Sequence, residues 1–251
     1  MDTVLLIHSG GFTSRQWRKL ADRLAPSHRV LTPDLLGYGP TPWPAGRPFH
    51  FTEDLAMLAT LFDEPAHLVG HSYGGFLALK LALEYPDRVR SLAVYEPVAF
   101  GILDEPADAP FRDELTRLPP YVPDAEGADE VWLAAFVDWW NGPGAWSQLA
   151  EPTRRAFRSV GWKVSREVAS LVDDHTDRTS YARITVPTLL LGGETSPATE
   201  RRVLAKLSAT LPAATLHTYA GLGHMGPITH ADLVNDAIVE HLTRVASRTS
   251  R

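Results

Sequence analysis

The sequence predicts an α/β fold with a mostly parallel, doubly wound sheet, and three features of the 251-residue chain lead to this prediction. Short apolar runs, typical of strands buried on both faces, alternate with stretches of helical periodicity over residues 4–95. The same alternation returns over residues 186–246. Between them, residues 100–183 hold helical stretches and proline-rich connections without a convincing buried strand. We therefore expect a core domain of residues 1–99 and 184–251, with residues 100–183 inserted as a helical cap over the carboxyl ends of the strands.

The individual elements follow from local patterns. Each strand is predicted from a short, largely apolar run, namely residues 4–7, 30–32, 66–69, 91–95, 186–191 and 215–217. Each core helix is predicted from apolar residues at helical spacing, namely residues 17–24, 51–62, 76–84, 197–211 and 231–246. Pro197 suits the start of its helix, because the first turn needs no hydrogen-bond donor from its nitrogen.

Composition and charge exclude several classes of function. The net charge of −6 leaves no basic footprint for nucleic acid or an anionic membrane surface. The absence of cysteine removes disulfides, thiolate nucleophiles and cysteine metal sites. We expect no signal peptide from the first residues, and no apolar run approaches the roughly 20 residues that span a bilayer. We expect a cytoplasmic protein whose partner is a small molecule, with no nucleic acid and no membrane.

The residues around Ser72 carry the strongest functional signal. Glycine stands two positions before this serine and two positions after it, at Gly70 and Gly74. The motif directly follows the predicted strand 66–69 and opens the predicted helix 76–84, which is the context of a nucleophile elbow. Side chains at the two glycine positions would collide with neighbouring elements, and the tight turn lifts the serine hydroxyl clear of the sheet. Ser72 is therefore the expected nucleophile.

His224 is the expected general base. It lies in the glycine-rich segment 221–226, which follows the last predicted strand and cannot form regular structure. Such a loop can bring an imidazole to a serine at the edge of the sheet. Three other histidines are expected to be structural, or to lie within a strand, namely His8, His71 and His217.

With these motifs in this order, the chain resembles an α/β-hydrolase over nearly its whole length. The resemblance rests on the elbow and on three further segments, namely His8-Ser9-Gly10-Gly11, Asp34-Leu35-Leu36-Gly37-Tyr38-Gly39 and the terminal Gly-x-Gly-His-Met. It implies that the backbone amides of Gly10 and Tyr73 form the oxyanion hole, and that Asp34 stabilises its own loop. No cofactor and no metal is expected. Because the nucleophile is serine, epoxide opening and dehalogenation, which use an aspartate nucleophile in this family, are not expected.

The acidic member of the triad is where the sequence departs from the family pattern. The family usually carries aspartate after the strand that corresponds to residues 186–191, but here that position holds Ser196. Two carboxylates are candidates to replace it. Glu194 lies in the usual loop, about two residues early, whereas Glu96 ends the strand after the elbow helix, where a subset of the family places its acid. We favour Glu96, because its longer side chain suits a slightly more distant strand, and keep Glu194 as the alternative.

The expected reaction is acyl transfer to Ser72 and then to water, on a carboxylic ester, lactone or thioester. The segment 100–183 is rich in aromatic residues, and four of them are expected to line an apolar substrate pocket, namely Trp132, Phe136, Trp139 and Trp140. One alternative is an enzyme of the same fold in a biosynthetic pathway, acting as a C–C hydrolase, cyclase or perhydrolase. Another is a ligand-binding protein with a degraded triad.

The resemblance also implies an exposed sheet edge. The family commonly has two strands ahead of the one predicted at residues 4–7, and we expect them to be missing here, leaving about six strands. The strand at residues 30–32 would then form the edge, where unpaired backbone groups favour association. We therefore expect either a covering element or a homodimer contact there.

Overall fold

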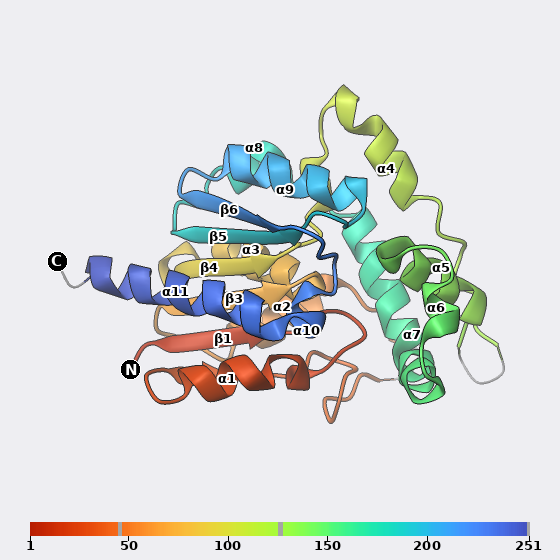
Figure 1. Ribbon diagram of the computed structural model, residues 1–251, viewed down its shortest axis with the longest axis horizontal. Helices are drawn as coiled ribbons and strands as arrows, with labels where there is room; N and C mark the ends of the chain where they lie inside the picture. The colour runs from red at the N-terminus through yellow and green to blue at the C-terminus, as the bar shows by residue number, and fades with distance from the viewer. Residues whose placement is uncertain (45–46, 125–127, 250–251) are drawn as a thin grey trace.

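The computed structural model describes residues 1–44, 47–124 and 128–249, and a sheet of six parallel strands forms its centre (Figure 1). The strands follow the order β2-β1-β3-β4-β5-β6 across the sheet. Their bounds are β1 (Thr3–Ile7), β2 (Arg29–Leu31), β3 (Ala66–His71), β4 (Val89–Tyr95), β5 (Thr188–Gly193) and β6 (Ala214–Tyr219). β1, β3 and β5 are buried along their whole length, as their continuous apolar runs predict. The predicted α/β class is confirmed.

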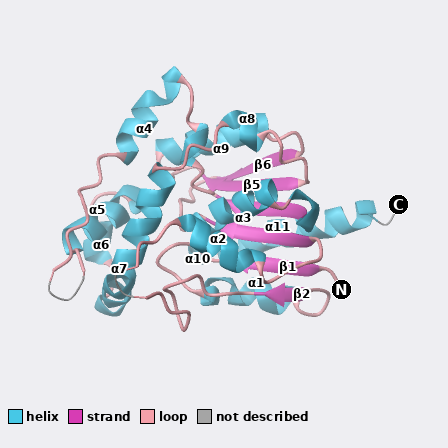
Figure 2. Ribbon diagram, turned by 180° about the vertical axis from the view of Figure 1, so that it is seen from behind, coloured by secondary structure: helices cyan, strands magenta, loops and turns pink. Residues whose placement is uncertain are grey.

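Helices cover both faces of the sheet (Figures 1 and 2). On one face, α1 (Arg18–Leu24) and α11 (Ala231–Thr249) share an apolar cluster with β1 and β5. On the other face, α2 (Phe51–Ala59), α3 (Tyr73–Glu84) and α9 (Ala198–Thr210) belong to a larger cluster. Shorter helical turns lie at Ser14–Trp17, Pro86–Arg88, Phe100–Ile102, Pro106–Asp108 and, as α10, Gly226–Thr229.

Four helices between β4 and β5 lie at the edge toward which the strands point (Figure 1). We call them the insertion helices: α4 (Ala109–Leu115), α5 (Glu130–Asn141), α6 (Ala145–Gln148) and α7 (Glu151–Val172). The next helix, α8 (Arg178–Tyr181), returns to the flank of the sheet beside α9. Open α/β sheets bind ligands at the carboxyl ends of their strands, so the insertion helices adjoin the place where a site is expected. The division into residues 1–99 with 184–251 and residues 100–183 stays a prediction.

β2 lies at one edge of the sheet, as expected. It is only three residues long, and short edge strands limit the unpaired backbone available for association. A homodimer contact at this edge stays a prediction that light scattering can test. Within the described residues, no helix combines the length and apolar character needed to cross a membrane.

Candidate active site

Ser72 occupies a strained turn between β3 and α3. Its backbone has a φ of 53° and a ψ of −122°, a conformation that residues other than glycine rarely adopt. A Cβ atom at position 70 would collide with the carbonyl oxygen of Gly74, and one at position 74 would collide with that of Ile7. Both glycines are therefore required by the close approach of the backbone, and the turn presents Ser72 to a cavity.

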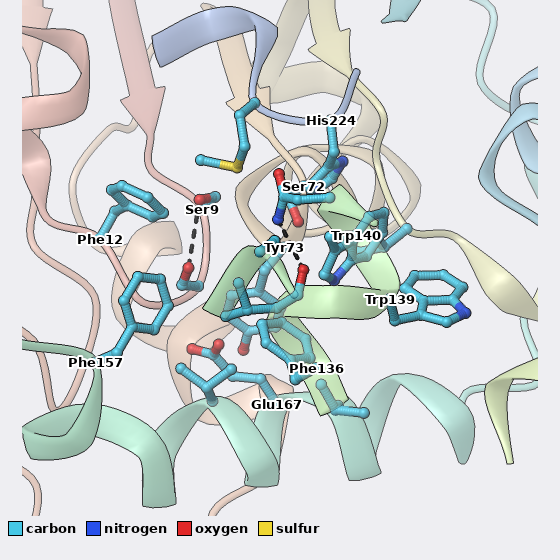
Figure 3. A pocket seen from close by; sticks show the side chains of 18 of the residues that line it. Ser9, Phe12, Ser72, Tyr73, Phe136, Trp139, Trp140, Phe157, Glu167 and His224 are labelled. Atoms are coloured by element: carbon cyan, nitrogen blue, oxygen red, sulfur yellow. Dashed lines mark hydrogen bonds between the residues drawn. The ribbon is translucent and has the colours of Figure 1, made fainter. Parts of the chain in front are cut away.

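A buried histidine–carboxylate pair lies beside this turn. Nδ1 of His224 lies 2.6 Å from Oε2 of Glu96, and the two side chains are 5% and 0% exposed. Glu96 follows β4 with a φ of 44°, and its Oε1 accepts hydrogen bonds from the backbone N–H of Gly193 at 2.7 Å and the hydroxyl of Ser196 at 2.6 Å. With Nδ1 bonded to the carboxylate, Nε2 has no hydrogen-bond partner in the described part of the chain and is available for a proton transfer. Ser72 and His224 line the same cavity, and Figure 3 shows both side chains at its wall.

The second carboxylate candidate lies elsewhere. Glu194 is exposed, and its Oε2 accepts a hydrogen bond from the backbone N–H of Gly221 at 3.3 Å. Ser196, at the position where the family usually has aspartate, is buried and donates to Glu96 instead. The structure thus brings Glu96, rather than Glu194, to His224.

Two histidines classed as structural hold the loops of the site. Nε2 of His71 lies 2.8 Å from the carbonyl oxygen of His224, and Nδ1 of His71 lies 3.1 Å from Nε2 of Gln16. Gln16 in turn accepts the backbone N–H of Ser9 at 3.0 Å, so this chain of hydrogen bonds ties the loop after β1 to the loop of His224. Burial, followed by the charge of His224, holds the pKa of His71 well below its usual range, which suits a neutral ring that donates from Nε2 and accepts at Nδ1.

His8 anchors the loop after β1 in a similar way. Its Nε2 accepts the backbone N–H of Leu35 at 3.0 Å, and burial lowers its pKa to about 4. The Asp34 carboxylate accepts the backbone N–H of Ser14 at 2.6 Å, which ties two loops together. Gly10 and Tyr73, the expected oxyanion donors, both line the cavity, and neither amide donates a hydrogen bond to any residue that the structure describes.

The cavity between the insertion helices and the sheet has a volume of about 510 Å³ and a mostly apolar lining (Figure 3). Three of the four predicted aromatic residues line it, namely Phe136, Trp139 and Trp140. The prediction for Trp132 is wrong: this side chain does not line the cavity, is 3% exposed, and stacks on Phe136 with 5.1 Å between ring centroids. Phe12 and Phe157, which were not predicted, also line the cavity.

A buried polar cluster, which sequence reasoning missed, reaches the cavity through Glu167 of α7. Lys163 donates to Glu167 Oε1 at 2.7 Å and to Asp54 Oδ2 at 2.8 Å. The hydroxyl of Tyr38 donates to Glu167 Oε2 at 3.0 Å, and that of Tyr73 donates to Asp54 Oδ2 at 2.9 Å. We call these five residues the Glu167 cluster. The only local signal for it is the spacing of Lys163 and Glu167 by one helical turn.

Comparison with known proteins gives one family. Residues 4–237 match the family described as "Alpha/beta hydrolase family". The lipase LipV from Mycobacterium tuberculosis is 35% identical over 139 residues, which is 54% of this chain and 51% of the lipase. A pimeloyl-[acyl-carrier protein] methyl ester esterase from Chromobacterium violaceum is 26% identical over 95% of this chain and 93% of the esterase. The chain spans about half the length of the first curated relatives that it matches.

The crystal structure of an enol-lactonase from Burkholderia xenovorans is also similar. It has a TM-score of 0.70 and 22% identity, and the match covers 96% of this chain and 91% of that one. At this level of identity, the likeness shows the fold alone.

Proposed function

The chain belongs to the alpha/beta hydrolase family, and on this premise we propose that it is a serine hydrolase that cleaves a carboxylic ester, lactone or thioester through an acyl-enzyme. One observation carries the proposal: the 2.6 Å contact between buried His224 and Glu96, next to Ser72 on its strained turn. A nucleophile, a base and an acid that orients the base are what acyl transfer to serine requires. The lipase and esterase among the relatives agree with this chemistry.

In the proposed mechanism, Nε2 of His224 takes the proton of the Ser72 hydroxyl, and the resulting alkoxide attacks the carbonyl carbon. Glu96 keeps the imidazole in the tautomer with its proton on Nδ1 and stabilises the imidazolium that forms. The amides of Gly10 and Tyr73 would bind the oxyanion, and Tyr73 contributes from the first turn of α3, where the helix dipole favours negative charge. The tetrahedral intermediate then collapses to the acyl-enzyme as His224 gives its proton to the departing alcohol or thiol. In the second step His224 takes a proton from water, the hydroxide attacks the acyl-enzyme, and the acid leaves as the proton returns to Ser72.

The cavity supports a substrate with an apolar portion. Its walls include aromatic side chains of α5 and aliphatic side chains of α7, and burial of an apolar group there contributes about 25 cal/mol per Å². We further propose that residues 100–183 act as the cap that closes this cavity over the strand ends.

The test is hydrolysis of a panel of p-nitrophenyl esters by the wild type and by Ser72→Ala, together with labelling by a fluorophosphonate. We expect the wild type to hydrolyse esters and to be labelled, and we expect both activities to be lost in Ser72→Ala. Ser9→Ala is the matched control, because Ser9 also lines the cavity but lies outside the elbow, and it should still be labelled. Labelling that persists in Ser72→Ala would contradict the assignment of the nucleophile. A wild type with neither labelling nor turnover would contradict the proposed function.

A further inference from the structure

A carboxyl group is buried in the wall that α7 contributes to the cavity. Glu167 is 2% exposed, and in Figure 3 its side chain rises from α7 toward the loop of Ser9. A Cβ atom at position 10 would overlap Oε2 of Glu167, so the carboxyl lies directly against the backbone of Gly10. The carboxyl thus stands close to the place where the proposed mechanism puts the substrate carbonyl.

The Glu167 cluster fixes this carboxyl in one orientation. Lys163 holds Oε1 and the Tyr38 hydroxyl holds Oε2, and the Tyr38 oxygen itself accepts the backbone N–H of Gly11 at 2.9 Å. Lys163 is fully buried and is bound on its other side by Asp54. A side chain locked on both oxygens is preorganised for a ligand, because little conformational freedom is left to lose on binding.

The cluster does not satisfy the hydrogen-bonding capacity of the carboxyl. Each carboxylate oxygen can accept about two hydrogen bonds, and each oxygen of Glu167 has one partner in the cluster. The cluster also contains one ammonium group for two carboxyl groups, since Lys163 is shared by Asp54 and Glu167. Burial raises the pKa of Glu167 to about 7, which reflects this incomplete compensation. A hydrogen-bond donor from the substrate would offset the desolvation of the carboxyl.

We propose that Glu167 is a substrate-binding residue that accepts a hydrogen bond from a hydroxyl group on the acyl part of the substrate, near the scissile carbonyl. The inference rests on the proposed function and extends it: the favoured substrates are hydroxyacyl esters rather than plain alkyl esters. The contact of Glu167 with Gly10 gives the position of the hydroxyl, because Gly10 is a proposed donor to the carbonyl oxygen.

The test compares p-nitrophenyl 3-hydroxybutyrate with p-nitrophenyl butyrate. At pH 8, above the pKa of about 7 of Glu167, we expect the wild type to prefer the hydroxy ester by about tenfold or more in kcat/KM, the effect of one hydrogen bond to a charged acceptor. Glu167→Met replaces the carboxyl by an apolar chain of similar length and should abolish this ratio, whereas Glu167→Gln keeps one oxygen and should retain part of it. Glu151→Gln, an exposed glutamate on the same helix, is the control and should keep the full ratio.

The ratio of kcat/KM for the hydroxy ester to kcat/KM for the plain ester separates this inference from the proposed function. Ser72-dependent hydrolysis of both esters without preference, or a preference that survives Glu167→Met, would overturn the role of Glu167 and leave the serine hydrolase intact. If the wild type hydrolyses neither ester, calorimetric titration of Ser72→Ala with the same esters makes the comparison, and the ester panel with fluorophosphonate labelling decides the proposed function separately. Tighter binding of the hydroxy ester that is lost on adding Glu167→Met supports the subsite, and equal binding overturns it.

Discussion

The indole ring of Trp140 lies flat against the imidazole of His224, with 3.6 Å between the ring centroids and 17° between the ring planes. Trp140 belongs to α5, so one of the insertion helices directly contacts the proposed base. The stack restricts rotation of the imidazole and favours the orientation in which Nδ1 meets Glu96. The insertion helices therefore contribute to the geometry of the site as well as to the walls of the cavity.

Removing this stack should lower kcat. We expect a two- to tenfold loss of ester hydrolysis in Trp140→Leu, since an aromatic pair contributes about 0.5–1.5 kcal/mol. Trp140→Phe should lose less, because a phenyl ring still covers the imidazole. Trp132→Phe is the control in steady-state kinetics, because Trp132 is buried in the same helix without lining the cavity. An equal loss in the control would indicate a general loosening of α5 instead.

Glu96 and Glu194 should differ sharply in their effect on activity. Glu96→Gln should reduce kcat on the order of 10³-fold or more, because a neutral amide can favour the wrong imidazole tautomer and cannot stabilise the imidazolium. Glu194→Gln should have a small effect, since Glu194 is exposed and bonds only the loop amide of Gly221 among the described residues. The measurement is kcat on a p-nitrophenyl ester, with thermal unfolding to check that both variants fold. The reverse ranking would rule out Glu96 as the acid.

The features predicted from sequence depend on local rules. Ser72 is recognisable because the steric demands of its turn fall on glycines two residues away on either side. Glu96 is recognisable as a candidate acid because it follows β4, which runs parallel to β3 and ends at the same edge of the sheet. Ser196 stands where the resemblance places an aspartate, and its hydroxyl donates to Glu96, the carboxylate that contacts His224.

The features that sequence did not predict depend on contacts between distant residues. Lys163 and Glu167 form an ordinary charged pair at helical spacing, and only the fold brings Asp54 to them. Helical periodicity likewise does not say which side of α5 meets the cavity, so Trp132 was wrongly grouped with its neighbours. The helix predicted over residues 51–62 ends earlier, at Ala59, where the Thr60 hydroxyl bonds the Met57 carbonyl.

The hydrogen bonds from Ser9 through Gln16 and His71 to His224 should matter for kcat more than for KM. Gln16→Met keeps the size of the side chain and breaks the link between the two loops. We therefore expect kcat to fall about two- to tenfold, which is the effect of losing one or two hydrogen bonds. Gln148→Met is the control, because Gln148 lines the cavity from α6 and is not part of this link. A change confined to KM in Gln16→Met would argue against a positioning role.

Glu200 of α9 is a buried carboxyl next to the proposed triad. It is 0% exposed, and neither oxygen has a partner of normal hydrogen-bond geometry among the described residues. Burial, followed by the charge of Glu96, holds the pKa of Glu200 well above the usual 4.5. The backbone N–H of Val98 lowers this pKa only in part, because that N–H already donates to the carbonyl oxygen of Glu96. The folded protein therefore holds the proton of Glu200 more tightly than the unfolded chain does.

Replacing Glu200 by glutamine should stabilise the protein as the pH rises. Because the folded-state pKa is raised, the wild type loses stability from about pH 4.5, where the unfolded carboxyl ionises, up to the folded-state pKa. Glu200→Gln cannot ionise, so its Tm should match that of the wild type near pH 4 and exceed it at pH 8, by roughly 2–4 °C for each kcal/mol gained. Glu240→Gln, on the surface of α11, is the control for an exposed carboxylate. A Tm difference that stays constant with pH would contradict a protonated Glu200.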